Sequence, residues 1–516
     1  MMKNHFLSFF LTLLAGAGYA FCYPSFLGSG WFPLLFVSMP YFLWRLESTP
    51  TVRRTLLQVL AFNLGLNLAG YYWIPQTLRE FGQLPYLVSI ILGLLFSLIL
   101  QPHWWLYVVW KKFRPNMDWG SEKGILLTAL IITLLERYVP QQFPSFAGSP
   151  WLHLSPFLGL APYGGVAIFS FITYWISMEI FNQLKMKKLR SEVWIVLVVF
   201  ILINTIFPLK NKHSDKTLSV RIVQANIGNF LKIQSEKGDQ NSFESVRKKY
   251  EDLSSISNNF GPQLILWPET AYPDTFFGSE TKLDDVFTNI MNKTGAEILI
   301  GGYDQDMSKS PFEMIESVYN SSILLSENKF KTSYHKNILI PFGETLPFGP
   351  LNSTIVSIVP AVSLFARGLG TPLMETREGY RFVTPICYEI LESNYMRTLL
   401  NTWGGNHLMI NHTNDSWYGE TAEPHQHLFL SKWRALEFKL PLIRTTNTGI
   451  SSVIYPDGTE SDRLSIGQEG ILDVVVPLGS GEASFYQVYG ILPLLVFVFV
   501  LGCITWLKEK FYSPHS

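Results

Sequence analysis

Long apolar runs constrain the fold of this chain more than any other feature of its sequence. Between Met1 and about Phe207 they are separated only by short polar breaks, and a further run closes the chain. Because about 20 predominantly apolar residues let a helix cross the hydrocarbon core of a bilayer, we expect a membrane α-helical bundle of about eight transmembrane helices. Buried core helices of a large soluble protein are the alternative, but several runs are longer than about 18 residues and almost free of charge. The expected spans lie near residues 5–22, 25–44, 55–77, 85–110, 121–138, 160–182, 191–207 and 489–507.

A mixed, polar stretch separates the last apolar run from the others. The sequence therefore predicts N-terminal transmembrane helices (about seven) over residues 1–209, a folded polar domain over 210–485, and a C-terminal transmembrane helix with a short tail over 486–516. The formal net charge is zero, so nothing in the composition indicates binding to nucleic acid.

Lysine and arginine gather in alternate breaks between the apolar runs, and such an excess marks cytoplasmic loops. Both termini are therefore expected in the cytoplasm, and the polar domain, which follows an odd number of spans, on the opposite side. In a bacterium that side is the periplasmic face of the inner membrane. The first run also has features of a signal peptide, but a second membrane-length run follows at once, which favours an uncleaved helix. The positive residues are Lys3, Arg45, Arg53, Arg54, Lys111, Lys112, Arg114, Lys123, Lys185, Lys187, Lys188, Arg190, Lys508 and Lys510.

Segments typical of strands and of helices alternate in the polar domain, which predicts a layered α/β fold. NSFESVRKKYEDLSSI and KLDDVFTNIMNKTG are the expected helices, and Gly295 should end the second one. The expected strands are LSVRIVQAN, QLILWPET, EILIGG, SVYNSSILLS, YRFVTPICYEI, NHLMINHTND, LIRTTNTG and ISSVIYPDG.

Several polar residues directly follow predicted strands, where loops of such folds carry chemistry. Glu269 follows LILW, Cys387 follows FVTPI, and Asn414 and Asp415 follow LMIN. Cys387 is the single cysteine of the polar domain, and thiols in an oxidising compartment usually pair. Two interpretations stay open at this point: Cys387 is a nucleophile, or it is a buried apolar side chain.

A carboxylate and a lysine would supply what such a thiol needs. A thiol with an ordinary pKa of about 8.5 is mostly protonated at neutral pH. A carboxylate can accept its proton during attack, and an ammonium can favour the thiolate and stabilise an oxyanion. Cys387, Glu269 and Lys336 thus form a complete set for acyl transfer, although each of the last two, taken alone, is equally a surface or loop residue. Glu344 is a further loop carboxylate after Lys336.

Histidines near these segments offer a Cys–His pair or a metal site as alternatives. His407 and His412 alternate with apolar residues in one predicted strand, which favours structural roles. His335 lies beside Lys336. His425 and His427 are two residues apart at the expected start of a helix and so do not share a face. Without a second ligand group at good spacing, we expect no metal site.

The order of the motifs carries a family resemblance. WPET, YHKNILIPFGE, ICYE and NHTNDSWYGETAEPHQHLFLSKWRALEFKLPLIRTTNTGISSVIYPDG resemble the nitrilase, or carbon–nitrogen hydrolase, superfamily. With the apolar frame they resemble the apolipoprotein N-acyltransferase family, and NDSWYG, QH, RALE and RTTNTG distinguish it from soluble nitrilases. The resemblance covers nearly the whole chain, including FPSFAGSPWLHLS. It implies an αββα sandwich on an eight-helix membrane base.

The resemblance also implies roles for individual residues. Glu269 would be the general base, Lys336 the oxyanion-stabilising lysine and Cys387 the nucleophile. Glu344, Tyr388 and Glu389 would support or shape the site. The family usually shows a proline and then a tryptophan where this chain has Gly228 and Ile233, a departure that concerns a lid or substrate contact rather than the catalytic residues.

The implied reaction is a ping-pong acyl transfer without metal or other cofactor. A phospholipid would donate its acyl chain to Cys387 as a thioester, and the N-terminal amine of a diacylglyceryl-cysteine on an apolipoprotein would accept it. The apolar stretch 351–368 is expected to serve as a lid or membrane contact, with Arg367 facing a phosphate headgroup. Two rivals remain: a membrane-tethered amidase or nitrilase, and a non-catalytic relative that binds lipoproteins.

Overall fold

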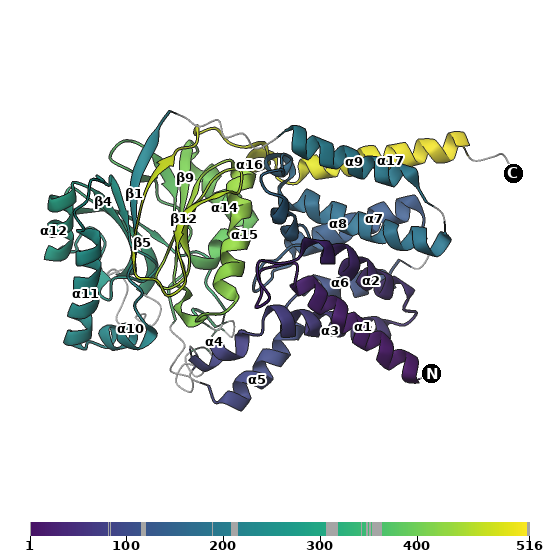
Figure 1. Ribbon diagram of the computed structural model, residues 1–516, viewed down its shortest axis with the longest axis horizontal. Coiled ribbons are helices and arrows are strands. Elements are labelled where there is room, and N and C mark those ends of the chain that lie inside the picture. Colours follow the sequence, from purple (N-terminus) through teal and green to yellow (C-terminus); the bar gives the residue numbers. More distant parts are fainter. Residues whose placement is uncertain are drawn as a thin grey trace. The chain divides into compact units, whose positions relative to one another are not determined.

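The computed structural model divides the chain into two compact units (Figure 1). The helical unit comprises Met1–Pro75, Tyr86–Lys210 and Ser484–Ser516, and the α/β unit comprises Gln76–Pro85 and Asn211–Ala483. The short segment Gln76–Pro85 thus belongs with the α/β unit although it lies among the N-terminal apolar runs. The structure describes residues 2–80, 82, 84–114, 120–187, 189–207, 215–305, 318–341, 343–346, 349, 352 and 364–512.

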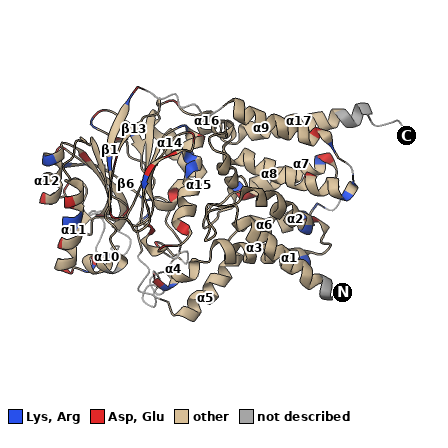
Figure 2. Ribbon diagram, in the orientation of Figure 1, with Lys and Arg blue, Asp and Glu red and all other residues tan. Residues whose placement is uncertain are grey.

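Helices form the first unit, and their charged residues gather near helix ends (Figure 2). α8 is buried along most of its length, and its residues Ala161–Met186 include Gly165, whose non-helical backbone kinks the helix. Turns interrupt the long apolar runs, so that α3 ends at Gly70 and α2 begins only at Leu35. The helices of this unit are α1 (Met2–Ala20), α2 (Leu35–Ser48), α3 (Val52–Gly70), α5 (Tyr86–Leu95), α6 (His103–Lys112), α7 (Glu122–Tyr138), α8 (Ala161–Met186), α9 (Ser191–Ile206), α16 (Phe485–Tyr489) and α17 (Leu492–Tyr512). α4 (Ile74–Glu80) begins in this unit, and its remaining residues belong with the α/β unit.

Length and composition qualify few of the described helices as membrane spans. α8 passes alone, and Tyr86–Leu98 passes only together with α6, from which it is bent by 40°. His5–Ala20, Ser191–Ile206 and Leu492–Leu507 are apolar but shorter. The expectation of about eight transmembrane helices is therefore not confirmed: the apolar runs are present, but turns within and between them leave most helices short of a full span.

Two sheets form the centre of the α/β unit. The first has the strand order β13-β1-β2-β4-β5-β6, with β3 beside β4, and the second has the order β12-β11-β10-β9-β8-β7. The first consists of β1 (Thr217–Gln224), β2 (Leu264–Leu266), β3 (Thr275–Phe276), β4 (Glu297–Gln305), β5 (Val318–Ser326), β6 (Lys329–His335) and β13 (Gly470–Pro477). The second consists of β7 (Met374–Glu375), β8 (Arg381–Val383), β9 (Asn406–Thr413), β10 (Leu442–Thr446), β11 (Ser451–Ile454) and β12 (Glu460–Leu464).

Helices cover the outer faces of both sheets, so the expected α/β domain is confirmed (Figure 1). α11 (Gln240–Ser254) and α12 (Asp285–Thr294) lie outside the first sheet, and Tyr250 of α11 stacks on Trp267 at 4.6 Å between ring centroids. α14 (Ser393–Trp403) and α15 (Glu423–Phe438) lie outside the second sheet. Gly295 ends α12 in a left-handed conformation, as its position predicted.

Several elements differ from the expectation. The strand predicted through YRFVTPICYEI ends at Val383, and a short 3₁₀ helix begins at Cys387. The sequence patterns also missed β6, β12, β13, α14 and α10 (Asn229–Glu236). β2 pairs in parallel with β1 and β4 in the first sheet, and β9 pairs in parallel with β8 and β10 in the second. A hydrogen bond from the Asn414 backbone N–H to Glu269 joins the segments that follow β9 and β2.

Candidate functional site

Lys336 lies between two carboxylates in the interior of the α/β unit. Its Nζ is 2.7 Å from Glu344 Oε1 and 3.3 Å from Glu269 Oε1, and the lysine side chain is wholly buried. The Asn320 amide donates to the same two oxygens, at 2.7 Å to Glu269 and 3.2 Å to Glu344. Burial disfavours the charged ammonium, but Glu269 and Glu344 hold the pKa of Lys336 well above its ordinary value. The lysine is therefore a fixed cation.

The loop after β2 aims Glu269 at this cation. Its Oε2 accepts a hydrogen bond of 2.9 Å from the backbone N–H of Asn414, which follows β9. Gly301 of β4 lies so close to the loop that a Cβ there would be 2.1 Å from the Pro268 carbonyl oxygen and 2.5 Å from the Glu269 Cα. Only glycine lets the loop pass at this distance.

Cys387 occupies a strained backbone position with a φ of +54°, in the left-handed region that residues with a Cβ rarely adopt. The Asn411 amide donates to the carbonyls on either side of this position, at 3.0 Å to Pro385 and 3.1 Å to Cys387. The residue is 5% exposed. A sharp, strained turn of this kind presents a nucleophile toward its partners.

The thiol is within electrostatic reach of all three charged residues. Burial and the charge of Glu269 raise the pKa of Cys387 well above its ordinary value, Lys336 opposes this, and Glu344 adds to it. The thiol is therefore protonated at rest and requires a base before it can attack. Among the charged residues that act on the thiol, Glu269 raises its pKa most.

Glu389 ties the segment after Lys336 to the segment before Cys387. Its carboxylate accepts hydrogen bonds from the backbone N–H groups of Asn337, Ile338 and Ile386, at 2.6, 2.8 and 2.8 Å. The Tyr334 hydroxyl donates to it at 2.7 Å. Burial raises the pKa of Glu389 to about 7 although these donors oppose the shift.

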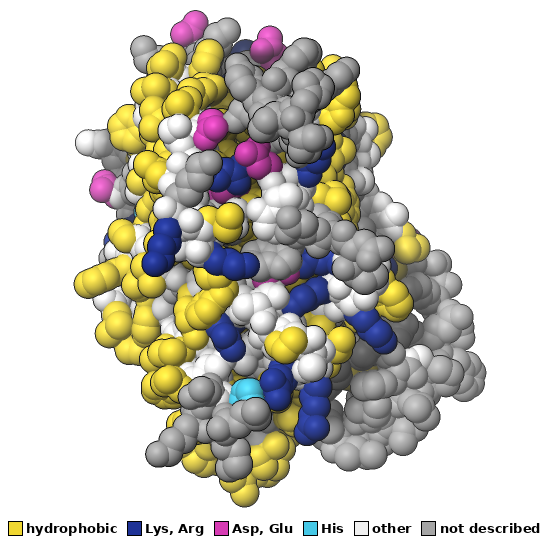
Figure 3. All heavy atoms as spheres, turned by 90° about the vertical axis from the view of Figure 1, so that its right-hand side faces the viewer, with side chains coloured by type: hydrophobic (Ala, Val, Ile, Leu, Met, Phe, Trp, Pro, Cys, Tyr) yellow, Lys and Arg dark blue, Asp and Glu magenta, His cyan; other side chains and the backbone are white. Residues whose placement is uncertain are grey.

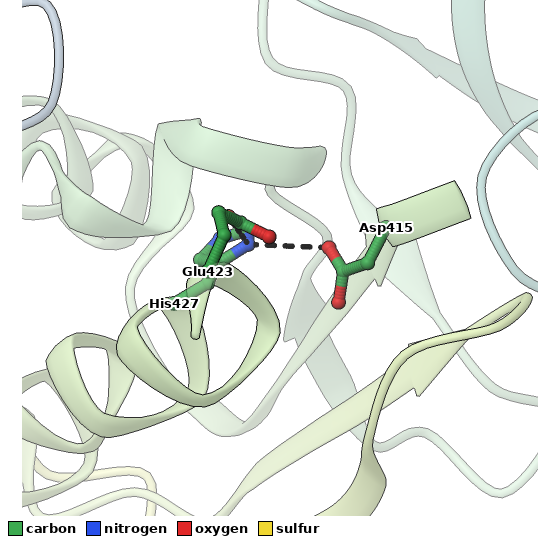
Figure 4. Close-up of side chains that lie close together, drawn as sticks. All are labelled: Asp415, Glu423 and His427. Carbon is green, nitrogen blue, oxygen red and sulfur yellow. Dashed lines mark ion pairs between the residues drawn. The ribbon is translucent and has the colours of Figure 1, made fainter. Parts of the chain in front are cut away.

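A second buried cluster lies behind Tyr388. One ligand atom each from Asp415, Glu423 and His427 lies within 4.8 Å of the others, a spacing that a metal ion could bridge (Figure 4). Arg444 Nη2 is 2.9 Å from Asp415 Oδ2, however, and this fixed positive charge opposes a second cation. His425, the neighbour of this group in sequence, is exposed.

The other histidines have partners that fit structural roles. His412 lies with Nδ1 2.8 Å from the Trp267 carbonyl and Nε2 3.1 Å from the Ser322 hydroxyl. His407 accepts from the Arg381 backbone N–H at 3.2 Å, and His335 Nε2 lies 2.9 Å from Asp304.

Three further predictions concern the expected lid, Arg367, and the departures at Gly228 and Ile233. Most of the expected lid 351–368 falls outside the described residues. Arg367 Nε donates to the Asn337 carbonyl at 2.8 Å, although the side chain is exposed. Gly228 caps α10 and Ile233 lies within it. The sequence patterns missed Lys232 of the same helix, whose buried Nζ donates to the hydroxyl of Thr270, the residue after Glu269.

Comparisons with known proteins support the motifs. The family described as carbon–nitrogen hydrolase matches residues 219–484, and the one described as apolipoprotein N-acyltransferase N-terminal domain matches residues 15–178. A relative from Bdellovibrio bacteriovorus, named apolipoprotein N-acyltransferase, is 30% identical over 499 residues, covering 91% of this chain and 89% of the relative. The chain belongs to the apolipoprotein N-acyltransferase family.

Other members and one solved structure extend the comparison. An apolipoprotein N-acyltransferase from Haemophilus influenzae is 29% identical over 534 residues, covering 98% of this chain and 97% of the relative. A solved carbon–nitrogen hydrolase superfamily protein from Xanthomonas campestris is 15% identical, with a TM-score of 0.37, and covers 51% of this chain and 91% of its own. The family assigned from the motifs is confirmed. The roles of Glu269, Lys336 and Cys387 remain predictions.

Proposed function

We propose that this chain transfers a fatty acyl chain from a phospholipid, through a thioester on Cys387, to the N-terminal amine of the diacylglyceryl-cysteine of an apolipoprotein. Membership of the apolipoprotein N-acyltransferase family supports the overall reaction. The observation that carries the mechanism is the buried Lys336 between Glu269 and Glu344, with the Cys387 thiol in the field of all three.

In the first half-reaction Glu269 accepts the thiol proton as the sulfur attacks the ester carbonyl of the phospholipid. The Lys336 ammonium stabilises the oxyanion that forms on the carbonyl oxygen. Collapse of this intermediate breaks the ester C–O bond, and Glu269 returns the proton to the departing oxygen. The products are the thioester and a lysophospholipid.

In the second half-reaction the amine of the lipoprotein attacks the thioester carbonyl. Glu269 accepts a proton from the amine, Lys336 again stabilises the oxyanion, and the C–S bond breaks. The proton passes to the sulfur, which restores the thiol and leaves an amide on the lipoprotein. Glu344 serves Lys336 throughout by holding its ammonium with a 2.7 Å contact.

Both substrates carry acyl chains, so the reaction belongs at a membrane. Moving a chain of roughly 16 carbons into water costs on the order of 10 kcal/mol at about 0.8 kcal/mol per CH₂. Large apolar side chains are exposed on the helical unit, among them Leu87, Ile195 and Phe499, each more than half exposed, as expected of a surface that faces lipid.

We further propose that the helical unit is embedded in the bacterial inner membrane with both termini cytoplasmic and the α/β unit periplasmic. Lys and Arg side chains lie among apolar ones on one end of the helical unit (Figure 3), which supports a cytoplasmic end by the positive-inside rule. The short helices accord with this where they cross the membrane in pairs or where the bilayer thins around them.

Mass spectrometry of Cys387 tests the proposal. After incubation of the full-length protein with phospholipid in detergent micelles, the Cys387 peptide of the native enzyme should carry a fatty acyl thioester, and Glu269→Ala should block its formation. Addition of a diacylglyceryl-peptide should discharge the thioester with acylation of the peptide amine. Release of free fatty acid with the amine unmodified would identify the hydrolase rival. Rescue of a transferase-deficient strain by Cys387→Ser would favour the non-catalytic one.

A further inference from the structure

α15 presents two buried side chains to Tyr388, the residue that follows the thiol. Glu423 and His427 are four residues apart and therefore lie on one face of this helix. The Tyr388 hydroxyl donates to Glu423 Oε1, and the His427 imidazole stacks on the tyrosine ring with centroids 4.4 Å apart and planes within 4°. Both the polar end and the aromatic face of Tyr388 are thus held by a single helical turn.

A polar chain leads from the same histidine back to the cysteine backbone. His427 Nδ1 is 3.5 Å from Asp415 Oδ1, a contact drawn as a dashed line in Figure 4. Asp415 Oδ2 accepts from Arg444 at 2.9 Å, and Arg444 also donates to Asn411 Oδ1 at 3.0 Å. The amide of Asn411 is the group that donates to the carbonyls of Pro385 and Cys387. The contacts therefore enclose residues 385–388 from two sides.

The charges of this group balance without a bound ion. Burial, followed by the charge of Asp415, raises the pKa of Glu423, and burial and Arg444 lower the pKa of His427 to about 4. Burial acts against ionisation of Asp415 as well, but Arg444 holds the pKa of that carboxyl below its ordinary value. Asp415 and Arg444 form an ion pair, while burial favours the uncharged forms of Glu423 and His427. With the Arg444 cation already beside Asp415, the arrangement fits mechanical support better than metal binding.

The backbone of Cys387 needs such support. Its φ of +54° is unfavourable for a residue with a Cβ and persists only where the surroundings over-determine it. Glu389 and Asn411 hold residues 386 and 387 by their backbone groups. Tyr388 is the next residue, and its contacts to α15 restrain the chain on the other side of the thiol.

We propose that Glu423 and His427 are positioning residues for the nucleophile. They hold the hydroxyl and the ring of Tyr388 and thereby fix the peptide between Cys387 and Tyr388. In that geometry the thiol points toward Glu269 and Lys336. This inference rests on the proposed role of Cys387. It predicts an effect on the rate of acylation rather than on phospholipid binding, since neither residue belongs to the acid–base set.

Single-turnover acylation of the full-length protein tests the inference. The rate of thioester formation on Cys387 is measured by mass spectrometry against phospholipid concentration in mixed micelles. His427→Ala and Glu423→Ala should lower the maximal rate by about 10- to 100-fold, the scale of a 1 Å misplacement, and leave the half-saturating phospholipid concentration unchanged. Glu423→Gln, whose amide oxygen still accepts from Tyr388, and His427→Phe, which still stacks, should restore most of the rate. His425→Ala, two residues away on the exposed side of α15, is the matched control and should behave as the native protein.

Three results would overturn the inference. One is a native maximal rate in both His427→Ala and Tyr388→Phe. Another is a loss in Glu423→Gln as large as that in Glu423→Ala. The third is a stoichiometric metal ion in the purified protein whose removal by a chelator lowers the acylation rate. If His427→Ala does not fold, the maximal rates of His427→Phe and Tyr388→Phe are compared, because only the second variant loses the bond to Glu423. Equal maximal rates in these two variants would then overturn the inference. Absence of any thioester in the native protein would instead refute the proposed function itself.

Discussion

Replacement of Lys336 by methionine would show how far the buried charges of the site depend on one cation. Methionine keeps the apolar stem and loses two charge-assisted bonds from Nζ, of 2.7 Å to Glu344 and 3.3 Å to Glu269. Hydrogen bonds to charged groups contribute about 1.5–3 kcal/mol each, and removing one partner of a buried ion pair costs about 3–5 kcal/mol. We therefore expect the free energy of unfolding of the α/β unit to fall by about 3–5 kcal/mol, because two carboxylates stay buried without an ammonium.

Pulse proteolysis of the full-length protein in detergent across a urea series measures this loss, because the protease cleaves only unfolded chains. With a urea m-value of about 3 kcal/mol/M, the midpoint for the α/β unit should fall by about 1–1.7 M. Lys329→Met, at an exposed position of β6, the strand that ends just before Lys336, is the control and should change the stability by less than about 0.5 kcal/mol.

A double-mutant cycle separates two causes of the stability loss in Lys336→Met: the carboxylates left without an ammonium, and the simple loss of packing. Adding Glu344→Gln to Lys336→Met removes one of the two unpaired carboxylates, so the double variant should be more stable than the sum of the single losses predicts, by about 0.5–3 kcal/mol. It should still form no thioester. An unchanged midpoint in Lys336→Met, or strict additivity in the double variant, would refute the account of Lys336 as the cation on which both carboxylates depend.

Two further predictions concern the loops that carry the reacting groups. Burial raises the pKa of Glu389 to about 7, against about 4.3 in an unfolded chain. Its contribution to stability is therefore present at low pH and is lost as the pH rises toward 7. The urea midpoint of the native protein should decline between pH 5 and pH 8, and that of Glu389→Gln should decline less. Gly301→Ala places a Cβ 2.1 Å from the Pro268 carbonyl oxygen, which should lower the free energy of unfolding by about 1–3 kcal/mol. Displacement of Glu269 should also lower the rate of thioester formation by about 100-fold. A native rate would show that the loop adapts freely.

Strand periodicity was sufficient to anticipate the parts of the site that lie at strand ends. β2 and β9 carry apolar residues that end abruptly, and Glu269 and Asn414 follow them as expected. Cys387 lies four residues beyond the end of β8, because the predicted strand stops at Val383 and the chain turns sharply. The family came from a different source, the resemblance of motifs such as WPET, ICYE and NDSWYG to known families.

Other parts of the site carry no local signal. Asn320 and Asn411 lie inside β5 and β9, where an asparagine among apolar neighbours gives no indication of the carboxylate or carbonyl that it will bond. The grouping of Asp415 with His427 depends on how α15 packs over the loop after β9. The helix lengths predicted for the N-terminal region were wrong for a different reason. Hydropathy measures how apolar a run is, but it does not indicate that α3 ends at Gly70.

The sheltered group formed by Lys336, Glu269 and Glu344 carries one positive and two negative charges, and the thiol beside it is neutral at rest. Under the proposed roles, a proton that leaves sulfur goes to Glu269 and later to the departing oxygen, so the total charge of this group and the reacting atoms stays at minus one from start to finish. Catalysis then requires no ion to enter or leave the interior. An enzyme built this way could work beside hydrocarbon, where importing charge is costly, and its turnover should be nearly indifferent to ionic strength.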